Sequence, residues 1–199
     1  FADRHRPAWH EERDQLLGAL AAQPPARTLD VACGTGWMTR YLPGDIVGLD
    51  ASESMLEIAR ERVPTGEFIV GDALALPFAD GSFDRLVTGH FYGHLEEPER
   101  LRFLAEARRV ALELVVVDSA LHEDAQPQEW QERVLLDGSR WEVFKRYFTG
   151  EELAAELGGG DVLFAERLNL SAHRRGRALV WTRLPKVGGG DAAATETSV

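Results

Sequence analysis

The sequence predicts an α/β domain with a mostly parallel sheet. Short apolar runs typical of buried strands alternate along the chain with amphipathic stretches typical of helices. The first three runs lead into a glycine turn or an acidic residue, namely Gly34, Asp50 and Asp72. Ligands bind beyond the carboxyl ends of the strands in such sheets, so a ligand site is predicted at this edge.

An N-terminal helix is predicted over residues 7–22, where Pro24 and Pro25 end it. Its apolar face is formed by Trp9, Leu16, Leu17 and Leu20. His5, Trp9 and His10 are secondary candidates for contact with a ligand, although ordinary packing or exposure is the favoured interpretation.

The most informative segment is LDVACGTGWMTRYL, residues 29–42. Gly34 and Gly36 permit positive φ and let a ligand approach the backbone, and a helix predicted from Trp37 would point its free N–H groups at that ligand. Thr39 stands where the dinucleotide fingerprint G-x-G-x-x-G has its third glycine, which disfavours NAD or FAD. Taken alone, the motif is also compatible with a tight structural turn.

A second strand is predicted over residues 45–50, followed by a helix that Ser52 could cap. Met55, Leu56 and Ala59 are predicted to share one face of that helix. Asp50 at the strand end is placed to accept hydrogen bonds from both hydroxyls of a ribose. The alternative is that Asp50 only begins the turn before the cap; the ribose role is favoured.

A third strand over residues 66–72 ends in Asp72, and Asp80-Gly81 predicts a turn before a strand over residues 83–88. Asp72 could accept from the exocyclic amine of adenine, while Ala73 offers its backbone N–H to a ring nitrogen. The alternative for Asp72 is that it only satisfies loop amides.

Four ordered motifs now carry a resemblance: LDVACGTG, VGLDAS, GDALALPFADGSFD and VTGHFYGHL. Together they resemble the class I S-adenosylmethionine-dependent methyltransferases of the small-molecule type. The resemblance implies a Rossmann-like methyltransferase fold, with a mostly parallel seven-stranded sheet, helices on both faces and a final antiparallel strand. It extends more weakly over residues 27–184. The family's glycine-rich link is missing from RRVALELVVVDSA, which leaves the element boundary near Leu112 open.

The resemblance also implies S-adenosylmethionine (SAM) as cofactor and S-adenosylhomocysteine (SAH) as product. No metal is expected, because the sequence has no evident carboxylate cluster or His/Cys ligand spacing. The residues that it places beside the methionine part of the cofactor are Asp30, Cys33, Gly34 and Gly36. Those that it places at the ribose are Asp50 and Ser52, and those at the adenine are Met55, Asp72 and Ala73. His90 and Phe91 would close over the sulfonium.

In the second half a helix is predicted from Pro98, followed by a buried strand in which Asp118 reaches the ligand edge. The apolar stripe assigned to this helix is Leu101, Leu104, Ala105 and Leu112. An insertion over residues 121–148 contains a hairpin signal around Asp137-Gly138-Ser139. This insertion is interpreted as a substrate lid or as a homodimer contact, and its aromatic residues are Trp130, Trp141, Phe144, Tyr147 and Phe148.

A helix is then predicted from about Thr149 to the glycines at 158–160, followed by two strands joined near Arg174-Arg175-Gly176. The predicted organisation is one domain over residues 1–185, with an N-terminal helical segment at 1–26, the insertion at 121–148 and a flexible tail at 186–199.

Composition narrows the choice of partners. The chain has 199 residues, 44% of them hydrophobic, and a net charge of −11, which disfavours a phosphate backbone as partner. No apolar run is long enough to predict a membrane span, and no secretory leader is recognised at Phe1. Cys33, the lone cysteine, cannot form an internal disulfide, and a cytoplasmic location is expected.

The sequence therefore predicts SAM-dependent methylation of a small molecule, with a hydroxyl oxygen preferred as acceptor atom. His90 and His94 are the candidates for a general base, His90 being favoured, and His122 is a third. The alternatives are a nucleotide-binding oxidoreductase and a non-catalytic SAM-binding protein.

Overall fold

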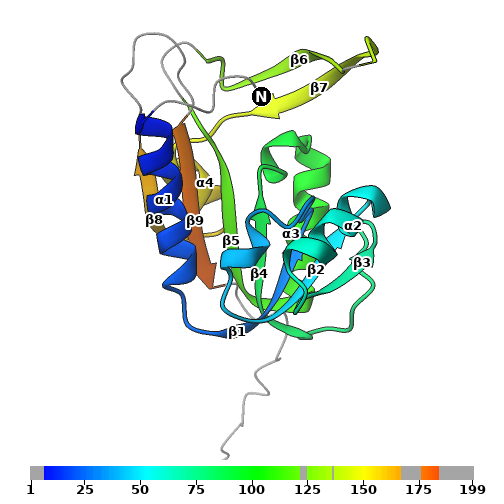
Figure 1. Ribbon diagram of the computed structural model, residues 1–199. Coiled ribbons are helices and arrows are strands. Elements are labelled where there is room, and N and C mark those ends of the chain that lie inside the picture. The colour runs from blue at the N-terminus through cyan, green and yellow to red at the C-terminus, as the bar shows by residue number, and fades with distance from the viewer. Residues whose placement is uncertain (1–6, 122–124, 136, 167–175, 184–199) are drawn as a thin grey trace, which may run out of the picture.

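The computed structural model describes residues 7–121, 125–135, 137–166 and 176–183. The chain forms an α/β sandwich in which helices cover both faces of one central sheet (Figure 1). His5 and His122 lie outside the described residues.

The first half alternates strands and helices along the chain. Its elements are α1 (Pro7–Ala21), β1 (Ala26–Val31), the 3-10 helix η1 (Thr39–Tyr41), β2 (Gly44–Asp50), α2 (Glu53–Arg62), β3 (Glu67–Val70), β4 (Phe83–Gly89) and the 3-10 helix η2 (Tyr92–His94). The second half adds α3 (Glu97–Val110), β5 (Ala111–Ala120), β6 (Gln128–Val134), β7 (Arg140–Arg146), α4 (Gly150–Glu156), β8 (Asp161–Glu166) and β9 (Gly176–Arg183).

The central sheet has seven strands in the order β3-β2-β1-β4-β5-β9-β8. Strands β1 to β5 are parallel, and β9 runs antiparallel between β5 and β8. The predicted Rossmann-like methyltransferase fold is therefore confirmed, including the antiparallel pair at one edge of the sheet. The carboxyl ends of β1, β2, β3 and β4 meet at one edge, as parallel strands require.

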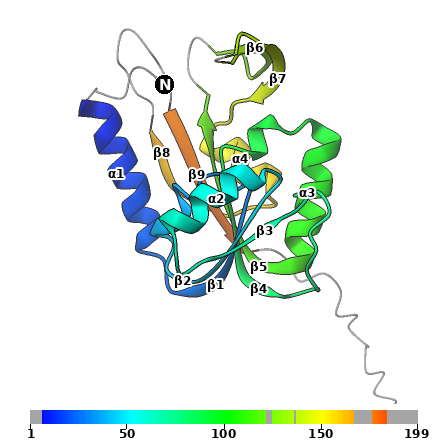
Figure 2. The ribbon, with the colours of Figure 1, turned by 45° about the vertical axis from the view of Figure 1, so that its right-hand side comes forward.

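Side chains alternate between the two faces of the buried strands, so each strand supplies two hydrophobic clusters. In β5, Leu114 and Val116 pack with α3 and α4, whereas Val115 and Val117 pack with Leu16, Leu17 and Leu20 of α1. Helix α2 packs through Leu56 and Ala59 against Phe68 and Cys33. Helices α1 and α2 thus cover one face of the sheet and α3 and α4 the other (Figure 2).

The prediction of a helix from Trp37 is wrong, because the described residues between β1 and β2 contain no α-helix. Residues 34–38 form turns, and only the single 3-10 turn η1 follows. The cause is Pro43: the residue before a proline avoids helical geometry, and Leu42 is extended with ψ 128°. Since β2 begins at Gly44, too few residues remain for a longer helix.

The apolar stripe predicted for α3 is only partly right. Leu104 is buried, but Leu101 and Ala105 are exposed and Leu112 belongs to β5. The face that covers the sheet is formed by Arg100, Phe103, Leu104, Ala107 and Val110. The boundary left open near Leu112 lies between Val110 and Ala111, where α3 passes directly into β5 without a loop.

The hairpin expected in the insertion is present as β6 and β7, which pair from Gln128 with Arg146 to Val134 with Arg140. Figure 1 shows it beyond the upper end of the central sheet. Phe148 forms an isolated bridge with Ala120, so the chain leaves and re-enters the domain at neighbouring points. The helix expected near Thr149 is α4, with a capping box between Thr149 and Glu152.

Two carboxylates, the buried Asp118 and the partly buried Glu156, join this insertion to the domain. Asp118 of β5 accepts from the backbone N–H of Gly93 at 2.7 Å and from the Lys145 ammonium of β7 at 2.7 Å. Glu156 of α4 binds Arg100 at 2.5 Å and Arg146 at 3.0 Å, and it accepts the Tyr92 hydroxyl. Both contacts bring η2 and β7 against the ends of the sheet.

Replacing Gly93 by alanine is expected to destabilise the fold by about 1–3 kcal/mol, because an added methyl group overpacks a filled site. A Cβ there would lie 2.7 Å from the Arg146 carbonyl oxygen and 2.8 Å from Asp118 Oδ1. Gly18 of α1 is the matched control: a Cβ meets nothing within 4 Å, so Gly18→Ala should stabilise by about 0.5–1 kcal/mol. Urea unfolding measures both; equal effects would contradict the close packing at Gly93.

Candidate functional site

The turn after β1 opens the backbone at the carboxyl edge of the sheet. Ala32, Gly34 and Gly36 all have positive φ, at 56°, 55° and 66°. A Cβ on Gly34 would meet nothing within 4 Å, whereas one on Gly36 would lie 3.2 Å from Ala59 of α2. Gly34 therefore leaves room for a ligand, and Gly36 lets the turn pack closely on α2.

Helix α2 also fixes this turn through a side chain. Arg62 donates to the carbonyl oxygen of Thr35 at 2.8 Å and to its hydroxyl at 2.6 Å. The residue between the two glycines is thereby held in place, so the turn is formed before any ligand arrives.

Asp30 lies under the turn with one carboxylate oxygen unpartnered. It is 1% exposed, and the Thr39 hydroxyl donates to its Oδ2 at 2.6 Å, while Oδ1 is buried without a hydrogen-bond partner. Burial raises the pKa of Asp30 to about 7, helped by the nearby Asp50 charge and opposed by the Thr39 hydrogen bond. A buried oxygen of this kind is expected to bind a cationic or hydrogen-bonding ligand group.

Asp50 at the end of β2 is half-buried and held by two backbone amides. Its Oδ2 accepts from Gly34 N–H at 2.8 Å and its Oδ1 from Ser52 N–H at 2.9 Å. The turn role considered from the sequence is thus present. A carboxylate has about four lone-pair sites, so two remain for a diol, and both interpretations of Asp50 are compatible.

The next two predicted residues lie at the start of α2. Ser52 occupies the N-cap position, but its hydroxyl contacts that of Ser54 and makes no capping hydrogen bond. Met55 is 43% exposed and does not share the buried face of Leu56 and Ala59. The prediction that these three share one face is wrong for Met55, because only Leu56 and Ala59 point at β3.

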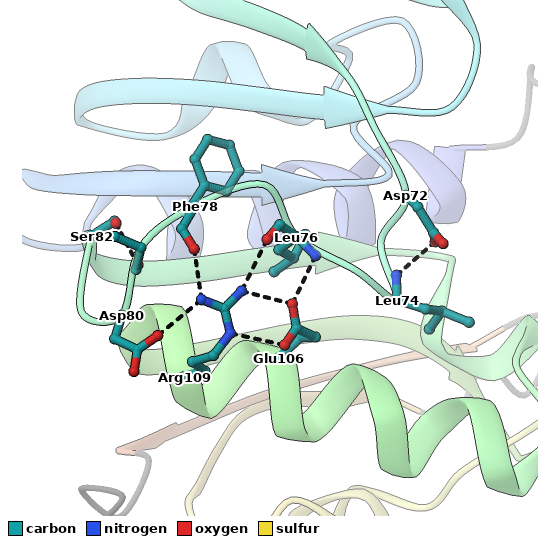
Figure 3. Close-up of polar contacts among 9 residues, drawn as sticks. Asp72, Leu74, Leu76, Phe78, Asp80, Ser82, Glu106 and Arg109 are labelled. Atoms are coloured by element: carbon teal, nitrogen blue, oxygen red, sulfur yellow. Dashed lines mark hydrogen bonds and ion pairs between the residues drawn. The ribbon is translucent and has the colours of Figure 1, made fainter.

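Asp72 begins the loop between β3 and β4 and accepts from Leu74 N–H at 2.8 Å, so it does satisfy a loop amide as the alternative interpretation expected. Figure 3 shows how α3 holds this loop. Arg109 donates to the carbonyl oxygens of Phe78 at 2.6 Å and Leu76 at 2.9 Å, and Glu106 accepts from Leu76 N–H at 2.8 Å. Sequence reasoning missed this clamp, because its partners lie about 30 residues apart.

Cys33 and Ala73 line the same edge as partly buried residues. Burial, with the charges of Asp30 and Asp50, raises the pKa of the Cys33 thiol well above its usual range, so the thiol stays protonated and inert. Ala73 packs against the core beside Leu74.

His90 follows β4 in a conformation that non-glycine residues seldom adopt. Its φ is 57°, and its N–H donates to the Val117 carbonyl oxygen at 2.7 Å. Positive φ turns the chain away from the sheet there and leaves His90 exposed at its edge. Phe91 is partly buried and packs edge-on against Phe103 of α3.

A cavity of about 330 Å³ lies between the ends of β4 and β5 and the hairpin. Its lining is polar except for Ala120, and the residues are His90, His94, Ser119, Ala120, Gln131, Glu132, Arg133, Lys145 and Tyr147. Gln131, Arg133 and Lys145 were not predicted as ligands, although their alternation along β6 and β7 places them on one face of the hairpin. Tyr147 is one of the aromatic residues of the insertion that the sequence singled out.

His94 lies at the wall of this cavity and is anchored to β7. Its Nδ1 is 2.8 Å from the Phe144 carbonyl oxygen, which can only accept, so Nδ1 carries the proton. Burial lowers the pKa of His94, and the neighbouring Lys145 lowers it further. The ring is thus neutral near pH 7 and keeps its lone pair on Nε2.

Metal ligation and membrane insertion find no support in the part of the chain that the structure describes. No group of three or more His, Cys, Asp or Glu side chains that could hold a metal ion occurs among the described residues. None of the helices in the described ranges is long and apolar enough to cross a membrane.

Known proteins resemble this chain in sequence and in fold. The demethylmenaquinone methyltransferase of Thermotoga maritima is 47% identical over 103 residues, which are 49% of this chain and 44% of that protein. Residues 29–113 match the family model described as a methyltransferase domain. Over these residues the chain is similar to the class I S-adenosylmethionine-dependent methyltransferases.

Solved structures of this methyltransferase fold cover most of the chain. The DhpI-SAM-HEP complex aligns with a TM-score of 0.71 and 23% identity over 89% of this chain and 88% of that one. The [4+2]-cyclase SpnF aligns with a TM-score of 0.65 and 22% identity over 94% and 87%. At these identities the likeness shows the fold alone.

The part of the chain that matches the methyltransferase domain runs from β1 to the start of β5. The chain spans under half the length of the Thermotoga relative. Residues 29–113 include the turn after β1, Asp50, Asp72 and His94, whereas the hairpin lies outside them. The sequence similarity therefore covers the residues at the carboxyl ends of β1 to β4, and it does not cover the hairpin.

The difference in unfolding free energy between Asp30→Asn and wild type should depend on pH. It should favour the variant by about 2–4 kcal/mol more at pH 8 than at pH 4. The folded-state pKa of about 7 exceeds the ordinary value of 3.8, so wild type loses stability as pH rises through this window. Urea unfolding at both pH values tests this, with Asp45→Asn at the exposed start of β2 as control. A stability difference between Asp30→Asn and wild type that stays constant with pH would contradict the raised pKa.

Proposed function

We propose that the protein transfers a methyl group from SAM to a hydroxyl oxygen of a small molecule bound in the cavity under the hairpin. The observation that carries this proposal is the position of His94, whose free Nε2 belongs to a polar cavity at the carboxyl ends of β4 and β5. His90 borders both the cavity and the end of β4. The cavity and the cofactor edge thus share one wall.

The residues at the carboxyl edge fit the cofactor. The unpartnered Asp30 Oδ1 supplies an acceptor for the α-ammonium of the methionine part, and the open backbone at Gly34 admits that part. Asp50 keeps two lone-pair sites for the ribose hydroxyls. Asp72 and Ala73, on the loop that Arg109 clamps, are with Met55 the candidates for adenine, and Ser52 is a candidate on the ribose side.

When bound, SAM supplies a methyl group on a positively charged sulfur. The protein has to align the acceptor oxygen with that methyl carbon and exclude water. The acceptor hydroxyl would lose its proton as it takes up the methyl group, with SAH as the leaving product, and His94 Nε2 would accept that proton. The Phe144 carbonyl oxygen holds the Nδ1–H and stabilises the imidazolium that results.

His94 is a better candidate for the general base than His90, the residue that the sequence favoured. The tautomer of His94 is fixed and its pKa is lowered, so the neutral ring is available at pH 7. His90 is exposed and positioned by its backbone. We assign His90 and Phe91 to the boundary between cofactor and acceptor.

The hairpin is proposed as a lid over the acceptor, since its side chains line one wall of the cavity. A homodimer contact through residues 121–148 is the competing role, and the exposed Trp130, Val134 and Trp141 are compatible with it. The expected cytoplasmic location and the absence of a nucleic-acid partner stay predictions from composition.

The fold alone does not require methyl transfer, because a neighbour of similar TM-score is named a [4+2]-cyclase. Titration calorimetry with SAM, SAH and NAD separates the alternatives. Micromolar binding of SAM and SAH without NAD supports the proposal. Binding of NAD instead would favour an oxidoreductase, and SAM binding without turnover over a broad hydroxyl panel would favour the non-catalytic protein.

Asp50→Ala should weaken SAM affinity by about 1.5–3 kcal/mol, the usual loss for hydrogen bonds to a charged group. Asp50→Asn keeps a polar side chain of the same shape and should lose less. Calorimetry measures the SAM affinity of both variants. Circular dichroism checks that losing the hydrogen bond between Asp50 and Gly34 has not unfolded the domain. Unchanged affinity in Asp50→Ala would remove the ribose assignment.

His94→Gln should lower kcat about 100-fold while the SAM dissociation constant changes less than about threefold. Wild-type kcat should rise with pH through an inflection below the ordinary histidine pKa, because burial lowers that of His94, and the inflection should vanish in the variant. His90→Gln is the matched control and should keep the inflection. Its loss in His90→Gln, with retention in His94→Gln, would reverse the assignment.

A further inference from the structure

The cavity under the hairpin offers more N–H donors than its own residues use. Arg133 donates to Gln131 Oε1 at 2.5 Å, and a guanidinium has five N–H groups. Lys145 uses one of its three N–H groups on Asp118 at 2.7 Å. The wall formed by the hairpin is therefore rich in donors.

Arg133 is an exposed side chain whose guanidinium donates to the neutral amide of Gln131. Gln131 places its oxygen toward Arg133 and its nitrogen toward the Tyr147 hydroxyl at 2.8 Å, and that nitrogen also donates to Glu129. The arrangement fixes the guanidinium at the cavity without neutralising it.

The other charges that line the cavity are paired. Lys145 is neutralised by Asp118, and Glu132 binds Arg140 at 2.7 Å. Within the described ranges, Arg133 forms no ion pair with a carboxylate. The cavity thus keeps one positive charge on a chain whose net charge is −11.

The effect on His94 is consistent with this local field. Arg133 and Lys145 both lower the pKa of His94, while Asp118 opposes them, and burial is the largest cause. The positive charge of Arg133, which adds to the lowering of that pKa, would also attract an anion into the cavity.

We propose that the acceptor is a small anion whose carboxylate or phosphate group binds Arg133 while its hydroxyl faces His94. The inference rests on the proposed function, because it names the acceptor class of the same site. A guanidinium matches both anionic groups through paired N–H donors. The polar lining disfavours an acceptor that is apolar throughout, since its surface would cover donors left without partners.

The test compares ligands that differ in charge. Benzoate and its neutral isostere benzamide are titrated by calorimetry into the SAH complex of wild type, Arg133→Gln and Arg102→Gln. Arg102 is exposed on α3, so its replacement removes the same charge away from the cavity. Phenyl phosphate in a parallel titration distinguishes a phosphate-type group from a carboxylate.

We expect wild type and Arg102→Gln to bind benzoate or phenyl phosphate at least tenfold more tightly than benzamide. Arg133→Gln should bring this ratio close to one, and Arg133→Lys should restore part of it. The His94 ring resonances, assigned with His94→Gln, should shift on addition of the anion.

Three results would overturn the proposal: equal binding of benzamide and the anions, an unchanged ratio in Arg133→Gln, or no anion binding by wild type. Absence of SAH binding would instead reject the proposed function. The anion titrations are therefore repeated on the protein without SAH, so that the two failures are distinguished.

Discussion

The buried contact between Asp118 and Lys145 determines where the insertion lies. Asp118 is fully buried and accepts from Lys145, from Gly93 N–H and from Ser119 N–H, all at 2.7 Å. Removing two charges from water is costly unless such partners satisfy them. Because these partners come from β5, η2 and β7, the contact holds the hairpin against the sheet and brings His94 beneath it.

The molecule divides its tasks between backbone and side chains. At the cofactor edge, turns with positive φ and backbone amides shape the site, and Arg62 and Arg109 hold two of its loops from outside. At the acceptor edge, side chains from the hairpin form most of the wall. An edge built from backbone and held by two arginines is suited to one constant ligand, the proposed cofactor. A wall built from side chains of an insertion can differ between proteins and so accommodate different acceptors.

The sequence predicted the turn after β1 and the acidic end of β2, because the residues that form them belong to short local patterns. Strand, glycine turn and acidic residue lie within a few positions, as with Gly34 and Asp50. Two predictions failed because a boundary or a neighbour in space determines the structure. Pro43 leaves room for only a 3-10 turn after Gly36, and Leu101 points to solvent and not to the sheet. The Asp118–Lys145 pair was beyond reach, because 27 residues separate its partners.

The direct passage from α3 to β5 has a further consequence. Arg109, which clamps the loop after β3, and Asp118, which anchors the hairpin, stand on one segment without a loop between them. Inserting a single residue at this junction would exchange the two faces of β5, turning Val115 and Val117 toward α3. The number of residues at this junction is therefore constrained, because an insertion would displace the anchor of the hairpin relative to the clamp on the loop after β3.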